Sequence, residues 1–316
     1  MKVSVAFIAY NHVKYVRQSL EGVLAQRADF DWEVVIGDDC STDGTGAIIA
    51  EFRDRYPDRI RVLPRERNLG MVRNVEDVLS ACTGEYVAML EGDDFWVSPD
   101  KLRLAAEFFD ANPSATVCFH PVKYLYEDGR SSHTFPRNPL PERLSVHELL
   151  RDNFIQTCSV MLRRSAMPLP FPDFFSSLKL LDWPICILAA DKGGIGQIAG
   201  ELATYRVHVG GVWSMKPAEQ IMLNVIGMME LLDAYFGGRR HAAIRETVLD
   251  CYGHLLRLRC GNPREIKSKS LRWVWDCPKG GPKFSRAAVR VLISIYAPWI
   301  LSSFRWLKGT PAANRP

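Results

Sequence analysis

Two acidic clusters contain the side chains best suited to chemistry in this sequence. Asp38 and Asp39 follow the run WEVVIG, and Glu91, Asp93 and Asp94 follow the run EYVAML. A carboxylate at a strand end can accept a hydrogen bond from a nucleotide base or a ribose hydroxyl. Two carboxylates on one turn can share a Mg²⁺ or Mn²⁺ ion that also binds diphosphate oxygens. The two clusters therefore favour a site for a nucleotide and a divalent cation.

Alternating strand and helix patterns position these clusters. Apolar runs predict strands over residues 3–8, 32–37, 60–63 and 85–90. Helical spacing, with a cap signal at Ser41 or Thr42 and Asp43 for the second helix, predicts helices over 12–26, 41–56, 72–81 and 99–111. This alternation is typical of an α/β domain with a mainly parallel sheet. Ligands of such sheets bind outside the carboxyl ends of the strands, so both clusters are expected to face one crevice.

The rest of the chain has a less regular pattern. We expect one long strand over 115–126, a polar, Pro-rich surface loop over 128–143 and a helix over 182–190. The runs 156–162 and 197–208 are β-like, and the Gly-, Pro- and Lys-rich segment 267–283 is a possible hinge before the last helix.

Five ordered segments resemble the successive motifs of family-2 glycosyltransferases. They are VSVAFIAYNHVKYV, VVIGDDCSTDGT, NLGMVRN, GEYVAMLEGDDFW and TCSVMLRR, and the similarity covers roughly residues 1–210. The resemblance implies an α/β, GT-A-like fold in which two halves share one mixed, mainly parallel sheet flanked by helices. These are a nucleotide-sugar-binding half (1–112) and an acceptor-binding half (113–212), followed by a C-terminal helical region (213–316).

The same resemblance implies the reaction. It is an inverting transfer of a sugar from a UDP-, GDP- or dTDP-sugar to an acceptor hydroxyl, assisted by Mn²⁺ or Mg²⁺. The residues that it places near the nucleotide are Ala9, Asp38, Asp39, Asn68, Gly70, Arg73 and Asp93. Asp39 is assigned the base contact, whereas Asp38 could instead cap the next helix. Arg73 could pair with the diphosphate or be an ordinary arginine on a helix surface.

The metal ligands implied by the resemblance are Asp94, Asp93, Glu91 and His208. Asp94 is the expected direct ligand, and Glu91 stands where the family more often has Asp. The alternative for this cluster is a solvated turn before the helix at Pro99. His208, in YRVHVGG, could also be a surface histidine after a strand.

The resemblance places the catalytic base at Asp182, in LLDWPI. A carboxylate there would deprotonate the attacking hydroxyl, which is ordinary general-base chemistry. Asp182 could instead be a helix N-cap, and Asp173 and Asp191 are alternative bases with less motif support. Thr157 and Ser159 resemble sugar or acceptor contacts.

The C-terminal part is strongly basic. Residues 239–308 contain fifteen Lys or Arg and four acidic residues, although the whole chain has a formal net charge of only +4. An uncharged run over 291–304, flanked by Arg290 and Arg305, is too short to span a bilayer but suits an interfacial helix. We therefore expect either a membrane-surface contact or, alternatively, a buried terminal helix or dimer contact.

Other features bear on compartment and on competing functions. The eight cysteines form no CxxC pair and mostly lie in apolar runs, and the first apolar run is too short for a signal peptide. We expect a cytoplasmic enzyme, peripheral at the membrane face, that acts on a glycan or lipid-linked acceptor in cell-surface polysaccharide or oligosaccharide synthesis. Nucleic acid is disfavoured because the basic residues lie away from the acidic clusters. The rivals are a non-catalytic nucleotide-sugar-binding protein and a nucleotidyltransferase, whose Gly-rich loop is missing. The oligomeric state is left open.

Overall fold

The computed structural model describes residues 1–211, 213, 216–259, 262–276 and 285–296. The chain divides into two compact units. The first, here called the sheet unit, consists of Met1–Val146, Phe154–Ser177 and Leu181–Val209. The second, the helical unit, consists of His147–Asn153, Leu178–Leu180 and Gly210–Pro316. Two short segments inside the expected acceptor-binding half thus group with the C-terminal region.

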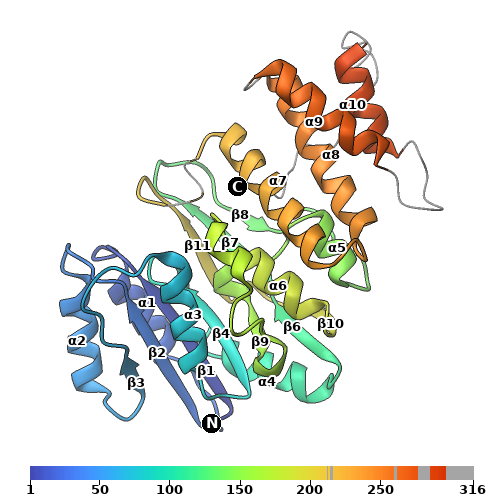
Figure 1. Cartoon of the computed structure of the whole chain (residues 1–316). Coiled ribbons are helices and arrows are strands. Elements are labelled where there is room, and N and C mark those ends of the chain that lie inside the picture. Colours follow the sequence, from blue (N-terminus) through green and yellow to red (C-terminus); the bar gives the residue numbers. More distant parts are fainter. Residues whose placement is uncertain (212, 214–215, 260–261, 277–284, 297–316) are drawn as a thin grey trace. The chain divides into compact units, whose positions relative to one another are not determined.

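A seven-stranded sheet forms the centre of the sheet unit (Figure 1). Its order is β10-β6-β9-β4-β1-β2-β3, and all neighbouring strands are parallel except at β9, which is antiparallel to β4 and β6. The strands are β1 (Val3–Ala9), β2 (Trp32–Asp38), β3 (Ile60–Val62), β4 (Tyr86–Glu91), β6 (Ala115–Phe119), β9 (Met161–Arg163) and β10 (Gly194–Gln197). The predicted mixed, mainly parallel α/β class is confirmed.

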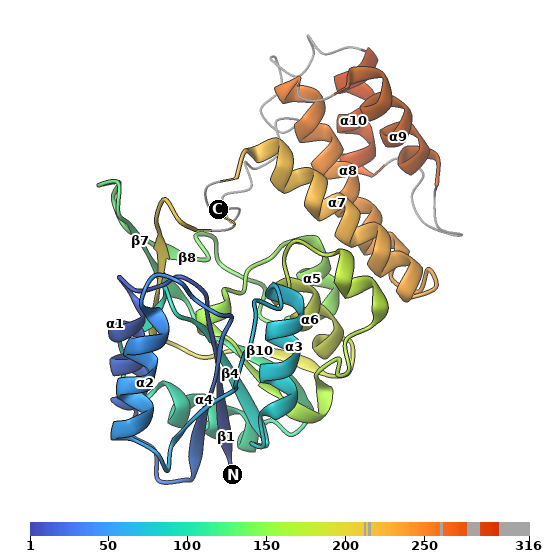
Figure 2. The same cartoon turned by 60° about the vertical axis from the view of Figure 1, so that its left-hand side comes forward.

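Helices cover both faces of this sheet. Figure 2 shows α1 and α2 on one side of β1 and β4, and α3 and α6 on the other. Their bounds, with that of α4, are α1 (Val16–Leu24), α2 (Thr45–Arg55), α3 (Met71–Ala81), α4 (Lys101–Ala111) and α6 (Asp182–Ala190). The first helix begins four residues later than the pattern suggests. Asn11, with φ at 56°, has a left-handed backbone conformation that a helix does not allow, so a loop connects β1 to α1.

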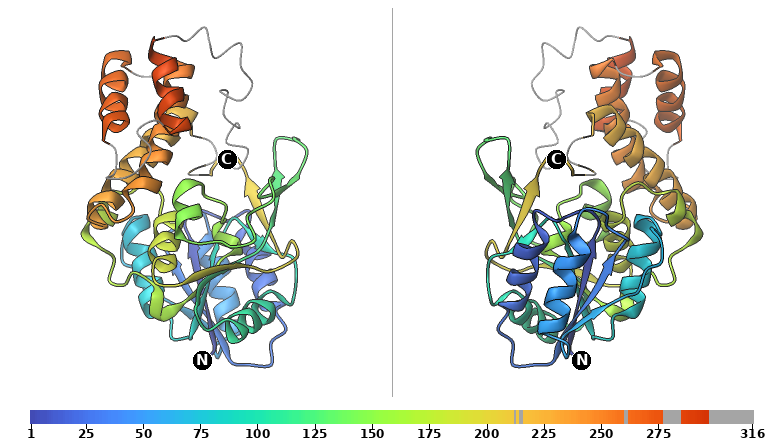
Figure 3. Two further views of the ribbon diagram at one scale, coloured as in Figure 1. Left: turned by 90° about the vertical axis from the view of Figure 1, so that its right-hand side faces the viewer. Right: turned by 90° about the vertical axis from the view of Figure 1, so that its left-hand side faces the viewer.

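A second sheet of four strands corrects three expectations (Figure 3). Its order is β5-β11-β7-β8, formed by β5 (Phe95–Trp96), β11 (Ala203–Val207), β7 (Val122–Tyr126) and β8 (His133–Phe135). The expected single sheet is therefore two sheets. The expected strand over 115–126 is two strands, because the chain changes sheet at Pro121, which has no N–H for a ladder. The expected loop over 128–143 contains β8, which pairs with β7 as a hairpin.

The run over 156–162 is also not one strand. It is interrupted by the short 3₁₀ helix η1 (Thr157–Ser159), and its paired strand, β9, begins only at Met161. Likewise, 197–208 spans the end of β10 and all of β11, which lie in different sheets. Two further 3₁₀ turns, η2 (Arg164–Ala166) and η3 (Asp173–Ser177), connect β9 to α6.

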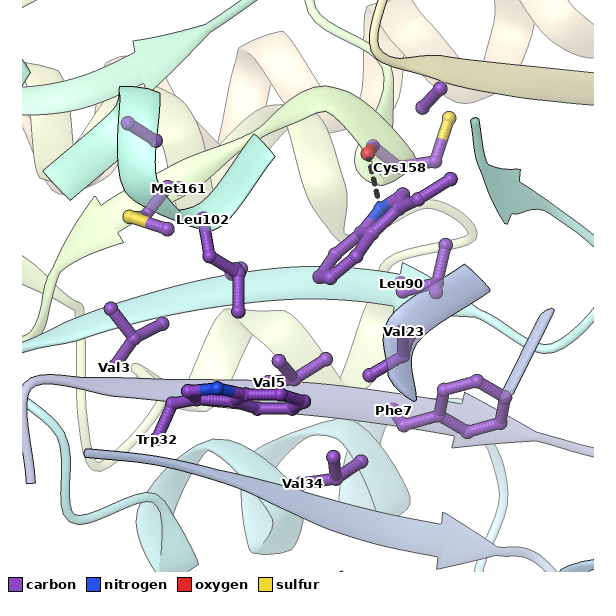
Figure 4. Packing of buried hydrophobic residues seen from close by; sticks show 14 of the residues in the cluster. Val3, Val5, Phe7, Val23, Trp32, Val34, Leu90, Leu102, Cys158 and Met161 are labelled. Carbon is purple, nitrogen blue, oxygen red and sulfur yellow. Dashed lines mark hydrogen bonds between the residues drawn. The ribbon is translucent and has the colours of Figure 1, made fainter. Parts of the chain in front are cut away.

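The core lies between the sheet and its helices. Figure 4 shows Val5 and Val34, from two neighbouring strands, close to Trp32, and Phe7 and Leu90 farther along the sheet. The four aliphatic and aromatic strand side chains are fully buried. Burial of each such side chain contributes about 1.5–3 kcal/mol, so the strand order is fixed largely by this apolar packing.

The helical unit contains α5 (Val146–Arg151) except its first residue, together with α7 (Ala218–Tyr235), α8 (His241–Leu258), α9 (Pro263–Trp275) and α10 (Arg286–Tyr296). Asn262 caps α9 by accepting a hydrogen bond from the Arg264 N–H. The expected hinge over 267–283 is wrong for residues 267–275, which are helical, and residues 277–284 lie outside the described part. The apolar run over 291–304 lies within the description only as far as Tyr296. None of the described helices combines the length and apolarity needed to cross a membrane.

Candidate active site

The register of the central strands brings the expected site residues to one edge of the sheet. Ala9 is paired with Asp38 across β1 and β2, and Ile8 is paired with Glu91 across β1 and β4. Because these strands are parallel, their carboxyl ends meet at the same edge. Both acidic clusters therefore extend from neighbouring strand ends, as the strand-end argument predicts.

Asp39 is buried and holds a loop in place. Its carboxylate accepts hydrogen bonds from the N–H groups of Leu69, at 2.7 Å, and Gly70, at 2.9 Å. Asn68 closes the arrangement, since its side-chain amide donates to the Asp39 carbonyl oxygen at 3.0 Å. Each Asp39 carboxylate oxygen retains a second lone pair that could accept from a ligand. The segment Asn68–Gly70 is thus fixed directly beside the end of β2.

Asp38 is half-buried and accepts hydrogen bonds from the N–H and hydroxyl groups of Ser41. The start of α2 depends instead on Asp43, which accepts from the Thr45 N–H at 3.0 Å. The N-cap position of α2 is Gly44, at φ 101°, and no side chain caps it. The expected cap at Ser41 or Thr42 is therefore wrong, although Asp43 does stabilise this turn.

Arg73 lies on the exposed side of α3. Its side chain is 65% exposed and pairs with Glu76 and Asp77 of the same helix, each at 3.2 Å. This position agrees with an arginine on a helix surface. Contact with a diphosphate would require the side chain to leave both acidic partners.

The turn from Glu91 to Asp94 is closed by backbone hydrogen bonds. The Gly92 N–H donates to the Ile8 carbonyl at 2.8 Å, and the Asp94 N–H donates to the Glu91 carbonyl at 3.1 Å. A Cβ atom at Gly92 would lie 2.9 Å from His12 Nδ1. A larger residue at Gly92 would therefore require the His12 side chain to shift.

Two histidines flank the Asp93 carboxylate. Its Oδ2 atom lies 3.1 Å from His208 Nε2 and 3.6 Å from His12 Nε2. Burial opposes ionisation, but the hydrogen bond from His208 and the charges of both histidines hold the pKa of Asp93 below its usual value. His208 is 7% exposed and lies against the acidic turn, so the alternative of a surface histidine is wrong, whereas its role as a metal ligand stays a prediction.

Asp94 is the most deeply buried carboxylate of the turn, with 2% exposure. Its Oδ1 accepts from the Arg206 N–H at 2.8 Å, whereas its buried Oδ2 accepts no hydrogen bond from an N–H or O–H group of the described residues; the nearby Cys158 thiol is a weak donor to this carboxylate. Burial and the charges of Asp93 and Glu91 raise the pKa of Asp94 well above its usual value. A buried carboxylate oxygen without a partner is costly unless a ligand satisfies it.

Glu91 and Asp182 complete one electrostatic cluster with this turn. Burial, followed by the charges of Asp93 and Asp182, raises the pKa of Glu91 to about 8. Asp182 is the first residue of α6, and the N-cap residue is Leu181. The alternative reading of Asp182 as an N-cap is therefore wrong. Its carboxylate stands at the positive end of the α6 dipole, where negative charge is favoured.

A comparison with known families decides what this geometry belongs to. The sequence profile described as Glycosyl transferase family 2 matches residues 4–168, just over half of the chain. The chain belongs to glycosyl transferase family 2.

Two relatives are similar in sequence to this family 2 chain over part of their length. It is 43% identical over 211 residues to uncharacterized protein Rv1520 of Mycobacterium tuberculosis, covering 67% of this chain and 60% of that protein, which is less than two thirds of its length. It is 34% identical over 157 residues to succinoglycan biosynthesis protein ExoO of Rhizobium meliloti, covering 47% and 43% of the two chains.

A solved structure confirms the expected GT-A-like fold. The mannosyltransferase PcManGT from Pyrobaculum calidifontis, in complex with GDP-Man and Mn²⁺, superimposes with a TM-score of 0.56 at 14% identity. The likeness covers 93% of this chain and 86% of that one. At this identity it shows the fold of the family 2 chain and nothing about its donor.

The carboxylates of the family 2 chain fit a cation only together with a substrate. In the described residues, no three His, Cys, Asp or Glu side chains are grouped so that they could hold a metal ion alone. The unpartnered Asp94 Oδ2 nevertheless offers a hard oxygen ligand beside two further acidic groups. Mg²⁺ sites commonly use one or two carboxylates and take the remaining ligands from substrate phosphates and water.

Sequence analysis missed two site residues of the family 2 chain. His12 follows β1 closely, so the strand-end argument could have included it. Arg206 lies two positions before His208, and alternate residues of a strand share a face. The strand pattern could therefore have placed Arg206 on the same face as His208, but not its contacts with the acidic turn.

Proposed function

We propose that this chain is a metal-assisted, inverting glycosyltransferase that moves a sugar from a nucleoside diphosphate to an acceptor hydroxyl. The observation that carries the proposal is the buried, unpartnered Oδ2 of Asp94 within an acidic cluster at the carboxyl edge of a family 2 sheet. This oxygen needs a cation, and the cation needs further oxygens of the kind that a diphosphate supplies. Because the similarity spans only 60% of Rv1520, it carries no statement about the whole length of that protein.

The nucleotide would bind along the ends of β1 and β2. Asp39 would accept a hydrogen bond from the base while it holds Asn68 and Gly70 against the sheet. Ala9 and Asp38 form the paired ends of the same strands, so ribose contacts fall there. Arg73 would join the diphosphate only by exchanging its helix partners.

A divalent cation, Mn²⁺ or Mg²⁺, would be held by Asp94 and Asp93, with Glu91 and His208 as neighbouring contacts. When bound, it supplies positive charge that stabilises the departing diphosphate. Asp93 is kept ionised by its two histidines, so it is ready to interact with a cation. Glu91, whose pKa is raised, would ionise more readily once positive charge is present.

Asp182 would act as the general base. Its place at the start of α6, close enough to influence the ionisation of Glu91, puts it on the same acidic cluster. It would accept the proton of the acceptor hydroxyl as that oxygen attacks the anomeric carbon. A single displacement inverts the configuration, so a β-linked product from an α-linked donor is expected.

The acceptor would be a glycan or lipid-linked oligosaccharide in cell-surface polysaccharide synthesis. The relative ExoO is named for succinoglycan biosynthesis, which supports a polysaccharide role. We place the enzyme in the cytoplasm, peripheral at the membrane surface through the helical unit. The exposed side of α9 contains Arg264, Lys267 and Arg272 together with Trp275, which is 65% exposed.

A donor panel tests the proposal. The full chain is incubated with UDP-, GDP- and dTDP-sugars and Mn²⁺, and release of the nucleoside diphosphate is followed with and without EDTA. Hydrolysis or transfer that needs the metal with at least one donor is expected. Binding without turnover for every donor, unchanged in Asp182→Asn, would instead indicate a non-catalytic nucleotide-sugar-binding protein.

A further inference from the structure

Arg206, on β11, contacts Asp93 and Asp94 of the acidic turn. Its Nε atom donates to the Asp93 carbonyl oxygen at 2.9 Å. Its main-chain N–H donates to Asp94 Oδ1 at 2.8 Å. The residue is buried, with 9% exposure, so these contacts are shielded from water. One arginine therefore fixes the turn through its side chain and the Asp94 carboxylate through its backbone.

The far side of the same guanidinium is anchored on α1 and on Glu127, the residue after β7. Nη2 donates to Gln18 Oε1 at 2.7 Å, and Nη1 lies 3.6 Å from Glu127 Oε1. The group also lies over the ring of Tyr15, 4.7 Å from its centroid. The Tyr15 hydroxyl in turn donates to Glu127 at 2.9 Å. The plane of the guanidinium is thus fixed both at its edges and on its face.

We propose that Arg206 is a positioning residue for the transfer reaction: its guanidinium fixes the Asp93 carbonyl, and with it the turn from which the Asp94 carboxylate extends. The inference rests on the proposed function, because it gives Asp94 the role of cation ligand. The Arg206 main-chain N–H holds Asp94 Oδ1, and the Arg206 side chain holds the preceding carbonyl of Asp93. Together these two contacts restrict the orientation of the Asp94 carboxylate and therefore of Oδ2. In this role Arg206 touches no substrate and acts only through the turn.

A simpler role would be charge neutralisation. The Arg206 guanidinium is a cation that lies 3.6 Å from Glu127 and contacts the acidic turn, and any cation there would reduce the repulsion between the carboxylates. The two roles differ for lysine, which keeps the charge but lacks the planar fork that joins Asp93 to Gln18. Under the positioning role, Arg206→Lys impairs the reaction. If Arg206 acted by charge neutralisation alone, Arg206→Lys would leave the rate of the reaction unchanged.

The experiment uses the full chain with Arg206→Lys, Gln18→Met and the double variant. Gln18 is exposed, so its substitution should leave folding intact even if Arg206→Lys does not fold. The matched control is Arg130→Lys. Arg130 also lies over a tyrosine, 4.1 Å from the Tyr126 centroid, and pairs with Asp128 at 2.8 Å, but it is exposed and does not contact the turn. Thermal unfolding, calorimetric binding of UDP and of GDP with Mn²⁺, and kcat/KM for donor hydrolysis are measured.

Arg206→Lys is expected to lower kcat/KM roughly 10- to 100-fold and to weaken Mn²⁺-dependent nucleotide binding, because misplacement of about 1 Å has effects of this size. Gln18→Met should lower kcat/KM less, and the two losses should be non-additive because both variants break one network. Arg130→Lys should match the unmodified chain.

Unchanged kcat/KM in Arg206→Lys, or in Gln18→Met if the lysine variant does not fold, would overturn the positioning role while the proposed function stands. Strictly additive losses would also overturn it. An unmodified chain that binds neither nucleotide and hydrolyses no donor would instead remove the proposed function itself.

Discussion

The indole Nε1 of Trp96 donates a hydrogen bond of 3.0 Å to the carbonyl oxygen of Cys158, which connects the apolar core to the acidic turn (Figure 4). Trp96 is buried in the core cluster. Cys158 belongs to η1, and burial together with the charge of Asp94 raises the pKa of its thiol. The Lys101 ammonium, also buried, lies 4.5 Å from the Trp96 ring centroid and donates to the Ser159 carbonyl at 3.5 Å. Two core side chains thus hold η1 from behind.

Trp96→Phe is expected to lower both stability and activity. It leaves the Cys158 carbonyl unsatisfied, which costs about 1–3 kcal/mol, and releases η1 next to Asp94. Urea unfolding and donor hydrolysis measure the two effects. The matched control is Trp32→Phe, a buried core tryptophan at the amino end of β2. It should lose stability but keep its kcat where it is folded. Equal activity in the two variants would contradict the connection.

Asp94→Asn is expected to abolish nearly all transfer while the protein stays folded. The amide keeps the size of the side chain and can still accept from the Arg206 N–H, but it is a poor ligand for a hard cation. Activity and thermal unfolding are compared with the unmodified chain over a range of Mn²⁺ concentrations. Full activity of the unmodified chain in EDTA would disprove metal assistance.

Asp182→Asn should separate binding from chemistry. An amide of the same shape cannot accept the proton, so kcat should fall roughly 10²-fold or more while calorimetric binding of the nucleotide is retained. Asp191→Asn, at the other end of α6, is the matched control and should be active. An unaffected kcat in Asp182→Asn would assign the base to another residue, and a retained anomeric configuration in the product would refute single displacement.

His120 is expected to make the fold less stable in mild acid. Burial, with the neighbouring charge of Lys101, lowers the pKa of His120 to about 3. The unfolded chain binds its proton near pH 6.5, so it takes up protons that the folded chain does not. Stability is therefore lost as the pH falls below about 6.5, by on the order of 2 kcal/mol between pH 7.5 and 5. Urea unfolding of the unmodified chain and of His120→Gln at both pH values tests this. The variant should lose less, and identical losses would show that His120 is protonated in the fold.

Charge reversal on α9 tests the membrane proposal. Lys267→Glu with Arg272→Glu should reduce sedimentation with anionic vesicles at low salt, since each basic residue near such a surface contributes about 1 kcal/mol. Arg53→Glu with Arg55→Glu, on exposed positions of α2, is the control and should bind as the unmodified chain does. If the unmodified chain does not sediment with anionic vesicles, the proposal fails. Deletion of α10 would be a poor test, because Ala287, Ala288 and Val291 are buried.

The sequence was most informative where structure is local. The strands that end at Asp38 and Glu91 are short apolar runs bounded by polar residues, and such runs predict strands without reference to the rest of the chain. The division between β6 and β7 was missed because CFHPVKYLY remains β-like across Pro121, and nothing local shows that its two parts join different sheets.

The site was predicted to a similar extent and for the same reason. Acidic residues at strand ends could be found one at a time. The clamp by Arg206 could not, because it joins residues 112 and 113 positions apart and depends on the second sheet. The role of Asp39 in holding Leu69 and Gly70 was likewise hidden, since the two segments are about thirty residues apart.

The separation between Asp94 and β11 also sets an order of events during synthesis. Translation proceeds at about 5–20 residues per second, so the ribosome adds the 112 residues between Asp94 and Arg206 in roughly 5–20 s. Throughout that interval the nascent strands β1, β2 and β4 can pair, but Asp94 has no Arg206 N–H to accept from. A polypeptide truncated before residue 203 would contain all seven strands of the central sheet together with Glu91, Asp93, Asp94 and Asp182, and would still lack a finished site.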